Sequence, residues 1–201
     1  MTVAVTGPFA SGKSTLVRLL GELPGIQTAS ADEIVHHLLT NDRRTVSRVI
    51  ERFGEEVRGP EGVDRKTLGR KVFGDAGALR DLEEILHPLV QSETDGRIEA
   101  SGAQVFVVEI PLLFETSRGE DFDFTVAVTV PEERRRAWAE ERGLDEAALR
   151  AVETRQFSGQ EKAAHADLIV QNDGDLDKLR EQAEGLGRMI SRERGSHGNP
   201  S

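Results

Sequence analysis

The segment Gly7-Pro8-Phe9-Ala10-Ser11-Gly12-Lys13-Ser14 decides the fold, because it fits the pattern G-x-x-x-x-G-K-[ST]. It follows a β-branched run, Thr2–Thr6, and precedes apolar residues at helical spacing between 16 and 20. A strand, a glycine-rich turn and a helix in this order wrap backbone N–H groups around phosphate oxygens, and the helix N-terminus adds a favourable potential. The segment therefore predicts a phosphate-binding loop.

Each residue of this loop has an expected task in binding a nucleoside triphosphate and Mg²⁺. Two glycines, at 7 and 12, let the backbone curl, and Lys13 brings a positive charge to the β- and γ-phosphates. The hydroxyl of Ser14 is the expected Mg²⁺ ligand. The expected nucleotide contacts are Gly7, Ala10, Ser11, Gly12, Lys13, Ser14 and Thr15.

The rest of the chain alternates short β-branched runs with longer helical patterns. Further strands are expected near 26–29, 105–109, 125–130 and 168–170, which predicts a parallel sheet covered by helices. Residues 54–64, with three glycines and Pro60, indicate a loop. Residues 132–155 are rich in arginine and glutamate, which favours a solvated, mobile helical element. The last ten residues, 192–201, are expected to be disordered.

Composition excludes several classes of function. The 201 residues suit one α/β domain, and the net charge of −10 argues against a general binder of nucleic acid or acidic membranes. There is no cysteine, so disulfides and thiolate chemistry are ruled out. No apolar run approaches the roughly 20 residues of a membrane span, and no signal-peptide pattern is present. We expect a cytoplasmic protein, a monomer or a small homo-oligomer, that acts on a small molecule.

Two carboxylates stand where the predicted sheet would present a ligand. Asp32 follows the second expected strand, so it can accept a proton from an acceptor hydroxyl or, alternatively, cap the helix that starts there. Glu109 ends another strand and is expected to hold an Mg²⁺-bound water. A GTPase switch is disfavoured, because the sequence contains neither N-K-x-D nor D-x-x-G. A small-molecule kinase needs such a carboxylate and an arginine-rich lid.

The order of five motifs resembles the dephospho-coenzyme A kinase family. They are T-G-x-x-x-S-G-K-S, A-D-x-I, D-R-x-x-L-x-x-x-V-F, L-E-x-I-L-H-P-L and P-L-L-F-E, at 6–14, 31–34, 64–73, 82–89 and 111–115. A further segment, A-D-L-I-V-Q-N at 166–172, is similar to the family's last strand and its asparagine. The resemblance spans about residues 1 to 180.

This resemblance implies a three-layer α/β/α P-loop kinase fold with a central parallel five-stranded sheet. It implies one domain over 1–201, with a core at about 1–30, 103–131 and 165–191, a helical acceptor-binding insertion at about 32–101, and a lid at about 132–160. The implied activity is ATP- and Mg²⁺-dependent phosphorylation of the ribose 3′-hydroxyl of dephospho-coenzyme A, giving coenzyme A and ADP.

The resemblance also implies the site residues. Asp32 matches the base, Lys13 and Arg142 match catalytic cations, and Asn172 matches an adenine contact. The expected acceptor contacts are Asp32, Arg65, His87 and Leu112. Proline inside a helical pattern predicts a bend at His87-Pro88 that would turn His87 towards a cleft. The other four histidines, at 36, 37, 165 and 197, have no assigned role.

The chain departs from the family pattern in the loop and in the lid. Pro8 and Ala10 replace glycines, and Pro8 removes an N–H donor from the phosphate loop. Ser30 replaces a common acidic residue. Trp138 and Val152 stand where lid arginines are common, and the neighbouring arginines at 134, 135 and 155 are the expected replacements. Two alternatives stay open: a nucleoside or nucleotide kinase of the same fold, and a non-catalytic ATP-binding regulator.

Overall fold

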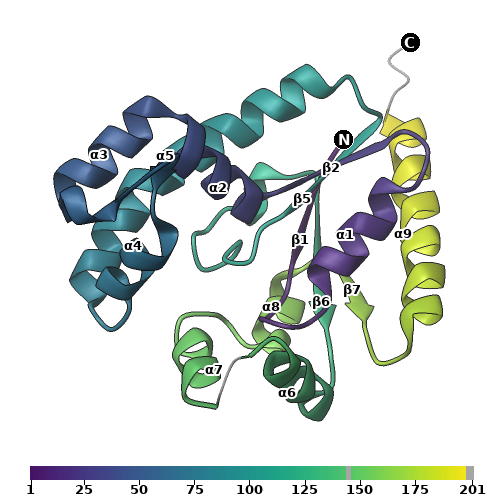
Figure 1. Ribbon diagram of the computed structural model, residues 1–201. Coiled ribbons are helices and arrows are strands. Elements are labelled where there is room, and N and C mark those ends of the chain that lie inside the picture. The colour runs from purple at the N-terminus through teal and green to yellow at the C-terminus, as the bar shows by residue number, and fades with distance from the viewer. Residues whose placement is uncertain (144–145, 198–201) are drawn as a thin grey trace. The chain divides into compact units, whose positions relative to one another are not determined.

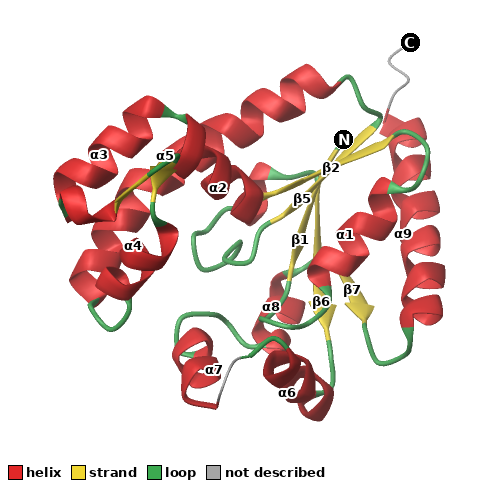
Figure 2. Ribbon diagram, viewed as in Figure 1, coloured by secondary structure: helices red, strands yellow, loops and turns green. Residues whose placement is uncertain are grey.

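A computed structural model of the chain describes residues 1–143 and 146–197. The chain divides into two compact units, one made of residues 1–30 and 101–201 and the other of residues 31–100. Figure 1 traces the chain through both units, and Figure 2 shows that all strands of the large sheet lie in the first unit. The second unit is helical apart from one short hairpin.

The first unit is built on a five-stranded sheet in which every neighbouring pair is parallel. Its strands, in the spatial order β2-β5-β1-β6-β7, are β2 (Ile26–Ser30), β5 (Val105–Glu109), β1 (Thr2–Thr6), β6 (Phe124–Thr129) and β7 (Leu168–Gln171). The buried residues of the central strands are mostly valine and alanine, as expected of a parallel sheet covered on both faces. The predicted fold class is confirmed.

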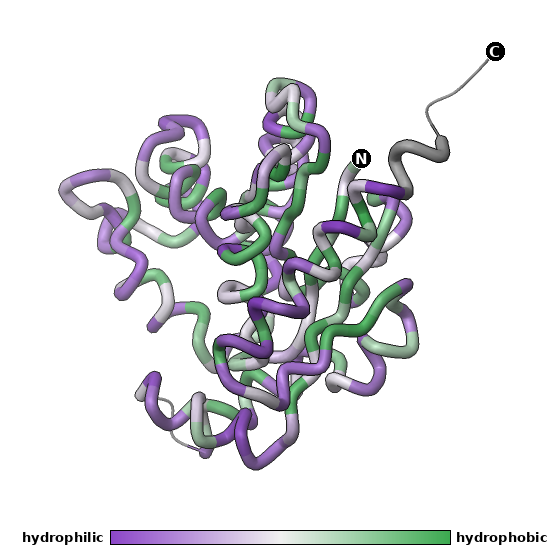
Figure 3. The backbone as a smooth tube through the Cα atoms, turned by 90° about the vertical axis from the view of Figure 1, so that its right-hand side faces the viewer, coloured by the Kyte–Doolittle hydropathy of each residue, from purple (hydrophilic) through white to green (hydrophobic). Residues whose placement is uncertain are grey.

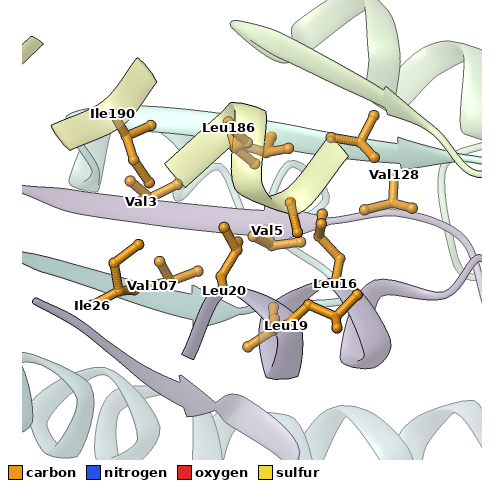
Figure 4. Packing of buried hydrophobic residues seen from close by; sticks show 14 of the residues in the cluster. Val3, Val5, Leu16, Leu19, Leu20, Ile26, Val107, Val128, Leu186 and Ile190 are labelled. Atoms are coloured by element: carbon orange, nitrogen blue, oxygen red, sulfur yellow. The ribbon is translucent and has the colours of Figure 1, made fainter. Parts of the chain in front are cut away.

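Helices cover both faces of this sheet. On one face α1 (Lys13–Gly21) and α9 (Leu176–His197) lie side by side, and their leucines meet Val3, Val5 and Val128 in the main core (Figures 1 and 4). On the other face α8 (Gly159–His165) packs against β6. Burying one leucine completely stabilises such a core by about 1.5–3 kcal/mol, so this packing fixes where β1 ends and the phosphate loop begins.

Two further helices of this unit follow β6, namely α6 (Glu132–Glu141) and α7 (Glu146–Glu153), where the lid is expected. A short 3₁₀ turn, Gly119–Asp121, precedes β6. The expectation of disorder from residue 192 is corrected, because α9 continues to His197. Ile190, near the end of this helix, is completely buried in the core and holds it there. Residues 198–201 of the expected tail lie outside the described residues.

The second unit packs its helices around a separate hydrophobic cluster that includes Leu39, Val49, Phe53 and Leu68. Its elements are α2 (Ala31–Asn41), α3 (Arg43–Phe53), a 3₁₀ turn (Glu55–Val57), β3 (Arg58–Gly59), β4 (Gly62–Val63), α4 (Arg65–Val72) and α5 (Ala76–Ser101). Figure 3 colours the backbone of the whole chain by hydropathy. In α3 the buried residues Thr45, Val49, Ile50 and Phe53 recur at helical spacing. Such amphipathic faces explain how a small unit of helices forms a core of its own.

One sequence expectation for this unit changes. The segment 54–64, expected to be a loop, contains the antiparallel hairpin of β3 and β4, in which Arg58 pairs with Val63. Pro88 lies inside α5, which continues past it to Ser101, and the bend expected at His87-Pro88 stays a prediction. Within the described part of the chain, no helix is both long and apolar enough to cross a membrane.

Candidate active site

The phosphate loop connects β1 to α1, and small residues occupy its positions with positive φ. Gly12 precedes α1 with φ 90°, and Ala10 also has a positive φ, 59°. A Cβ atom at Gly12 would lie 2.2 Å from the Nδ2 atom of Asn172, so a side chain at this position would collide with it. Ala10, at a cost of about 1–2 kcal/mol, takes a backbone conformation that glycine adopts freely.

Two polar side chains of the loop are buried and face inward. The Nζ atom of Lys13, a residue that is 7% exposed, donates a hydrogen bond to the carbonyl oxygen of Pro8 at 3.0 Å. The Ser11 hydroxyl is buried and has no hydrogen-bond partner among the described residues. Because a buried hydroxyl normally has a partner, this orphaned group fits a loop whose partner is a ligand oxygen.

Ser14 and Glu109, the two expected Mg²⁺ residues, lie together. Glu109 ends β5 and pairs in register with Val5 of β1, the strand that leads into the loop. The Ser14 hydroxyl donates to Glu109 Oε1 at 2.9 Å, and Glu109 is buried. Hard oxygen donors at this edge suit Mg²⁺, which needs few protein ligands because phosphates and waters complete its shell. The residues present therefore fit the ion.

Asn172, the expected adenine contact, holds the phosphate loop. It is buried after β7, its backbone N–H donates to Thr129 O at 2.7 Å, and its Nδ2 donates to Ser11 O at 2.9 Å. These bonds fix the loop from behind. Asn172 also lines a cavity of about 290 Å³ beside the loop. The cavity is formed by Gly12, Thr15, Trp138, Glu141, Arg142, Asn172, Gly174, Asp175, Leu176 and Leu179.

Arg142 reaches the same region from the end of α6. Its guanidinium carbon lies 5.8 Å from the centre of the Phe9 ring, within the range of a cation–π interaction. It also lines the 290 Å³ cavity with Thr15 and Asn172. The expected lid arginine and the expected nucleotide contacts are therefore brought together.

Two of the expected replacement arginines, Arg134 and Arg135, are engaged by other residues of the first unit. Arg134 donates to Gly174 O and lies over the Trp138 ring at 5.7 Å. Arg135 is buried and pairs with Glu132 at 2.9 Å and with Glu153. Burial opposes the charged form of Arg135, but hydrogen bonds to the two carboxylates outweigh it and raise the pKa of the guanidinium. Arg135 therefore ties α6 to α7.

Three residues behind the loop were missed by the sequence analysis. The Nζ atom of Lys162 is 2.7 Å from Pro111 O and 2.7 Å from Glu115 Oε1, and the side chain is completely buried. Glu115 Oε1 also accepts the Phe157 N–H at 2.7 Å, and Gln156 Oε1 accepts the Phe9 N–H at 3.1 Å. The ion pair of Lys162 and Glu115 could not be predicted, because two charged residues far apart in the sequence produce no periodic pattern. The available signal was that Glu115 is the last residue of the P-L-L-F-E motif.

Leu112, an expected acceptor contact, lies half-buried in the turn after β5. Its carbonyl oxygen accepts the Thr116 hydroxyl at 2.7 Å, and the neighbouring Leu113 is completely buried. These contacts explain the turn. The role of Leu112 towards an acceptor stays a prediction.

The remaining candidates belong to the second unit. Asp32 is exposed, and it is the second residue of α2, which begins at Ala31. It is therefore not the residue that caps this helix, and in its own unit it makes no hydrogen bond with another described residue. His87 is exposed on α5. The next residue, Pro88, has no N–H and so cannot donate a helical hydrogen bond.

Arg65 begins α4, directly after Asp64, which caps that helix by accepting the Lys66 N–H at 3.0 Å. The Nη1 atom of Arg65 lies 3.3 Å from Nδ1 of His36. His36 is one helical turn after Asp32 on α2, so the two share a face of that helix. The sequence analysis gave His36 no role, and the spacing of four residues from Asp32 was the available signal.

Comparison with known proteins agrees with this arrangement. A family model described as "CoaE: Dephospho-CoA kinase" matches residues 1–178. A dephospho-CoA kinase of Symbiobacterium thermophilum is 38% identical over 191 residues, covering 92% of this chain and 80% of that protein. A dephospho-CoA kinase of Protochlamydia amoebophila is 34% identical and covers 92% of this chain and 93% of its own length.

Solved structures give the same result. The crystal structure of TT1252 from Thermus thermophilus superposes with a TM-score of 0.78 at 28% identity, covering 94% of this chain and 97% of that chain. Dephospho-CoA kinase from Campylobacter jejuni has a TM-score of 0.65 at 25% identity over 95% of this chain and 97% of its own. A shikimate kinase from Acinetobacter baumannii, at 14% identity and a TM-score of 0.55, shares the fold alone. The chain belongs to the dephospho-CoA kinase family.

Proposed function

We propose that this chain transfers the γ-phosphate of ATP to the ribose 3′-hydroxyl of dephospho-coenzyme A, giving coenzyme A and ADP. Membership of the family supports this reaction, and the geometry of the phosphate loop supports the assignment of the reaction to particular residues. The loop at 7–14 has an inward Lys13, an orphaned Ser11 hydroxyl and a Ser14 hydroxyl bound to Glu109 at 2.9 Å. Such a cradle suits a triphosphate with its divalent ion.

In the proposed reaction, positively charged side chains at the phosphate loop would stabilise the negative charge of the phosphoryl group during its transfer. Lys13 is held at the loop by Pro8 O, and Arg142 lies at the cavity beside Thr15. Ser14 and Glu109 would hold Mg²⁺, directly or through water, and the ion would neutralise charge on the β- and γ-phosphates. The buried positive charge of Lys13 is worth more than an exposed charge would be, because little water screens it.

The acceptor is proposed to meet the second unit. Asp32 would accept the proton of the 3′-hydroxyl, and as an exposed carboxylate it is free to do so. Arg65, His87 and, in the first unit, Leu112 are the proposed acceptor contacts. His36, one helical turn after Asp32, lies 3.3 Å from the Nη1 atom of Arg65. The hydrogen-bond donors of Arg65 would suit an anionic substrate such as one that carries a diphosphate.

A substrate panel tests this function. ADP release is measured with dephospho-coenzyme A, with nucleosides and with nucleoside monophosphates, and the position of the new phosphate is read by mass spectrometry and NMR. We expect dephospho-coenzyme A to have the highest kcat/KM and the phosphate to be on the 3′-oxygen. A preference for a nucleoside or nucleotide would reassign the enzyme. ATP binding without any turnover would favour the regulator, the reading that Trp138 in place of an arginine supports.

A further inference from the structure

The backbone N–H of Phe9, in the middle of the phosphate loop, is taken by a side chain from outside the loop. Gln156 Oε1 accepts it at 3.1 Å, across a separation of 147 residues in sequence. Phe9 stands between Pro8, which has no N–H, and Ala10, which is in a left-handed conformation. A strained conformation persists only where surrounding contacts hold it. The loop therefore depends on contacts such as this one for its shape.

Gln156 is itself held from both sides along the chain. Three residues before it, Glu153 at the end of α7 pairs with the buried Arg135. One residue after it, the Phe157 N–H donates to Glu115 Oε1 at 2.7 Å, and Lys162 fixes that carboxylate at 2.7 Å. Lys162 also contacts Thr6, the residue before the phosphate loop, at 3.4 Å. The segment that carries Gln156 is thus anchored to the same strand end from which the loop starts.

The surroundings suit a contact that sets a position. Phe9 and Gln156 line one cavity of about 350 Å³, together with Pro8, Glu153 and Phe157. Gln156 is uncharged and partly buried. Its side-chain oxygen accepts a backbone N–H, a group that every residue type except proline would provide at position 9. The contact therefore acts on the loop backbone and not on the Phe9 side chain.

We propose that Gln156 is a positioning residue for phosphoryl transfer. Its amide oxygen holds the Phe9 N–H, and so presets the phosphate loop in the shape that receives the triphosphate. The residue joins the segment after α7 to the loop, so the site is organised before the nucleotide arrives. This inference rests on the proposed function, because a preset loop matters only if the loop binds ATP.

Two variants of Gln156 distinguish the effect of its hydrogen bond from the effect of its side-chain size. Gln156→Met keeps the length of the side chain but has no amide oxygen, whereas Gln156→Glu keeps an acceptor oxygen. Gln160→Met, at an exposed glutamine of α8, is the matched control. For each variant we measure the Kd of MgATP by calorimetry, kcat, the KM for each substrate, and Tm.

The loss of one partly buried hydrogen bond corresponds to about a tenfold effect on affinity. We expect Gln156→Met to raise the Kd of MgATP about tenfold, with the KM for dephospho-coenzyme A within about twofold and Tm close to that of Gln160→Met. In Gln156→Glu the retained acceptor should keep kcat within about threefold of wild type. Its added negative charge should raise the KM for ATP, and salt should reduce that rise.

Equal losses of ATP affinity in Gln156→Met and Gln156→Glu at high salt, where the added charge is screened, would overturn the proposal, as would a Gln156→Met variant that matches Gln160→Met. Slow hydrogen exchange of the Phe9 amide in nucleotide-free wild type is a second requirement, and fast exchange would also overturn it. A wild type that binds MgATP tightly but does not phosphorylate dephospho-coenzyme A would refute the proposed function instead, and the Kd values would still test Gln156.

Discussion

The two units place their candidate residues in opposite surroundings. In the first unit Lys13, Ser11, Glu109 and Asn172 are buried, and backbone atoms or neighbouring side chains hold most of them in place. In the second unit Asp32, Arg65 and His87 are exposed on helices. In the proposed function, the triphosphate would meet buried side chains that the fold already holds in place, and the acceptor would meet exposed side chains.

This difference has a thermodynamic meaning. Buried polar groups contribute to the stability of the fold as well as to binding, because leaving one unpaired costs about 1–3 kcal/mol. Exposed polar groups contribute little to stability, and substitutions there usually stay within about 0.5 kcal/mol. Variants of the first unit should change stability and activity together. Variants of the exposed residues of the second unit should change activity alone.

The largest effect on activity without an effect on stability is expected at Asp32. Asp32→Asn removes the proposed base and should lower kcat by about 10² to 10⁴-fold, with the Kd of ATP and Tm unchanged. Steady-state kinetics and calorimetry measure the two effects. Glu33→Gln, the next exposed carboxylate of α2, is the control and should match wild type. Activity of Asp32→Asn within about threefold of wild type would remove the base from the mechanism.

At Lys162, in the first unit, a substitution is expected to lower the stability of the fold. Burial lowers the pKa of this amine, against the effect of Glu115. Lys162→Met leaves the largely buried Glu115 carboxylate without its cation, at a cost of about 3–5 kcal/mol in the free energy of unfolding. Urea unfolding measures the loss. The double variant with Glu115→Gln should recover much of it, and a single variant that costs under about 1 kcal/mol would contradict the buried pair.

A smaller effect is expected at Arg65. Arg65→Ala should raise the KM for dephospho-coenzyme A about tenfold, the size of one lost charged hydrogen bond, and leave the KM for ATP unchanged. Arg70→Ala on the same helix α4 is the control, because that exposed guanidinium hydrogen-bonds within its own helix, to Thr67 at 2.9 Å. Equal KM values for the two variants would exclude Arg65 from the acceptor site.

The smallest effect is one of stability alone, at the start of α3. Asp42 caps this helix by accepting the Thr45 N–H at 3.0 Å, so Asp42→Ala should cost about 1 kcal/mol near neutral pH. The hydrogen bond from the Thr45 hydroxyl lowers the pKa of Asp42 below its ordinary 3.8. The stabilisation is therefore present above pH 3.8 and is lost as the pH falls through the lower, folded value.

Chemical unfolding at several pH values checks this cap, with kcat measured beside it. The difference between wild type and Asp42→Ala should shrink as the pH falls, whereas Asp42→Asn should keep a cap that does not titrate. A constant difference down to acid pH, or a loss of kcat in Asp42→Ala, would contradict the separation of stability from activity in this unit.

The sequence predicted what local patterns encode. The five parallel strands and the loop at 7–14 follow from β-branched runs and from a motif whose spacing is itself the structure. The pairing of Ser14 with Glu109 could also be predicted, because both follow neighbouring strands to the same edge. The motif for the end of β7 identified Asn172 but not its bond to Ser11 O.

Contacts between distant segments could not be predicted in the same way. The bonds of Gln156 to Phe9 and of Lys162 to Thr6 join residues 147 and 156 positions apart, and no periodicity records them. The helical end of α9 differs from the expected disorder because a chain end usually lacks order, whereas here Ile190 anchors the helix to the core. The hairpin at 58–63 could not be predicted because strands of two residues have no pattern of their own.

The central claim is that the loop at 7–14 is a preformed cradle for magnesium-bound triphosphate, and calorimetric titration with ATP tests it most directly. Wild type should bind ATP in the presence of Mg²⁺ and more weakly without it. Lys13→Ala should abolish most of that binding, since it removes the buried cation. Binding that is absent in wild type, or is the same in Lys13→Ala and independent of Mg²⁺, would contradict the account.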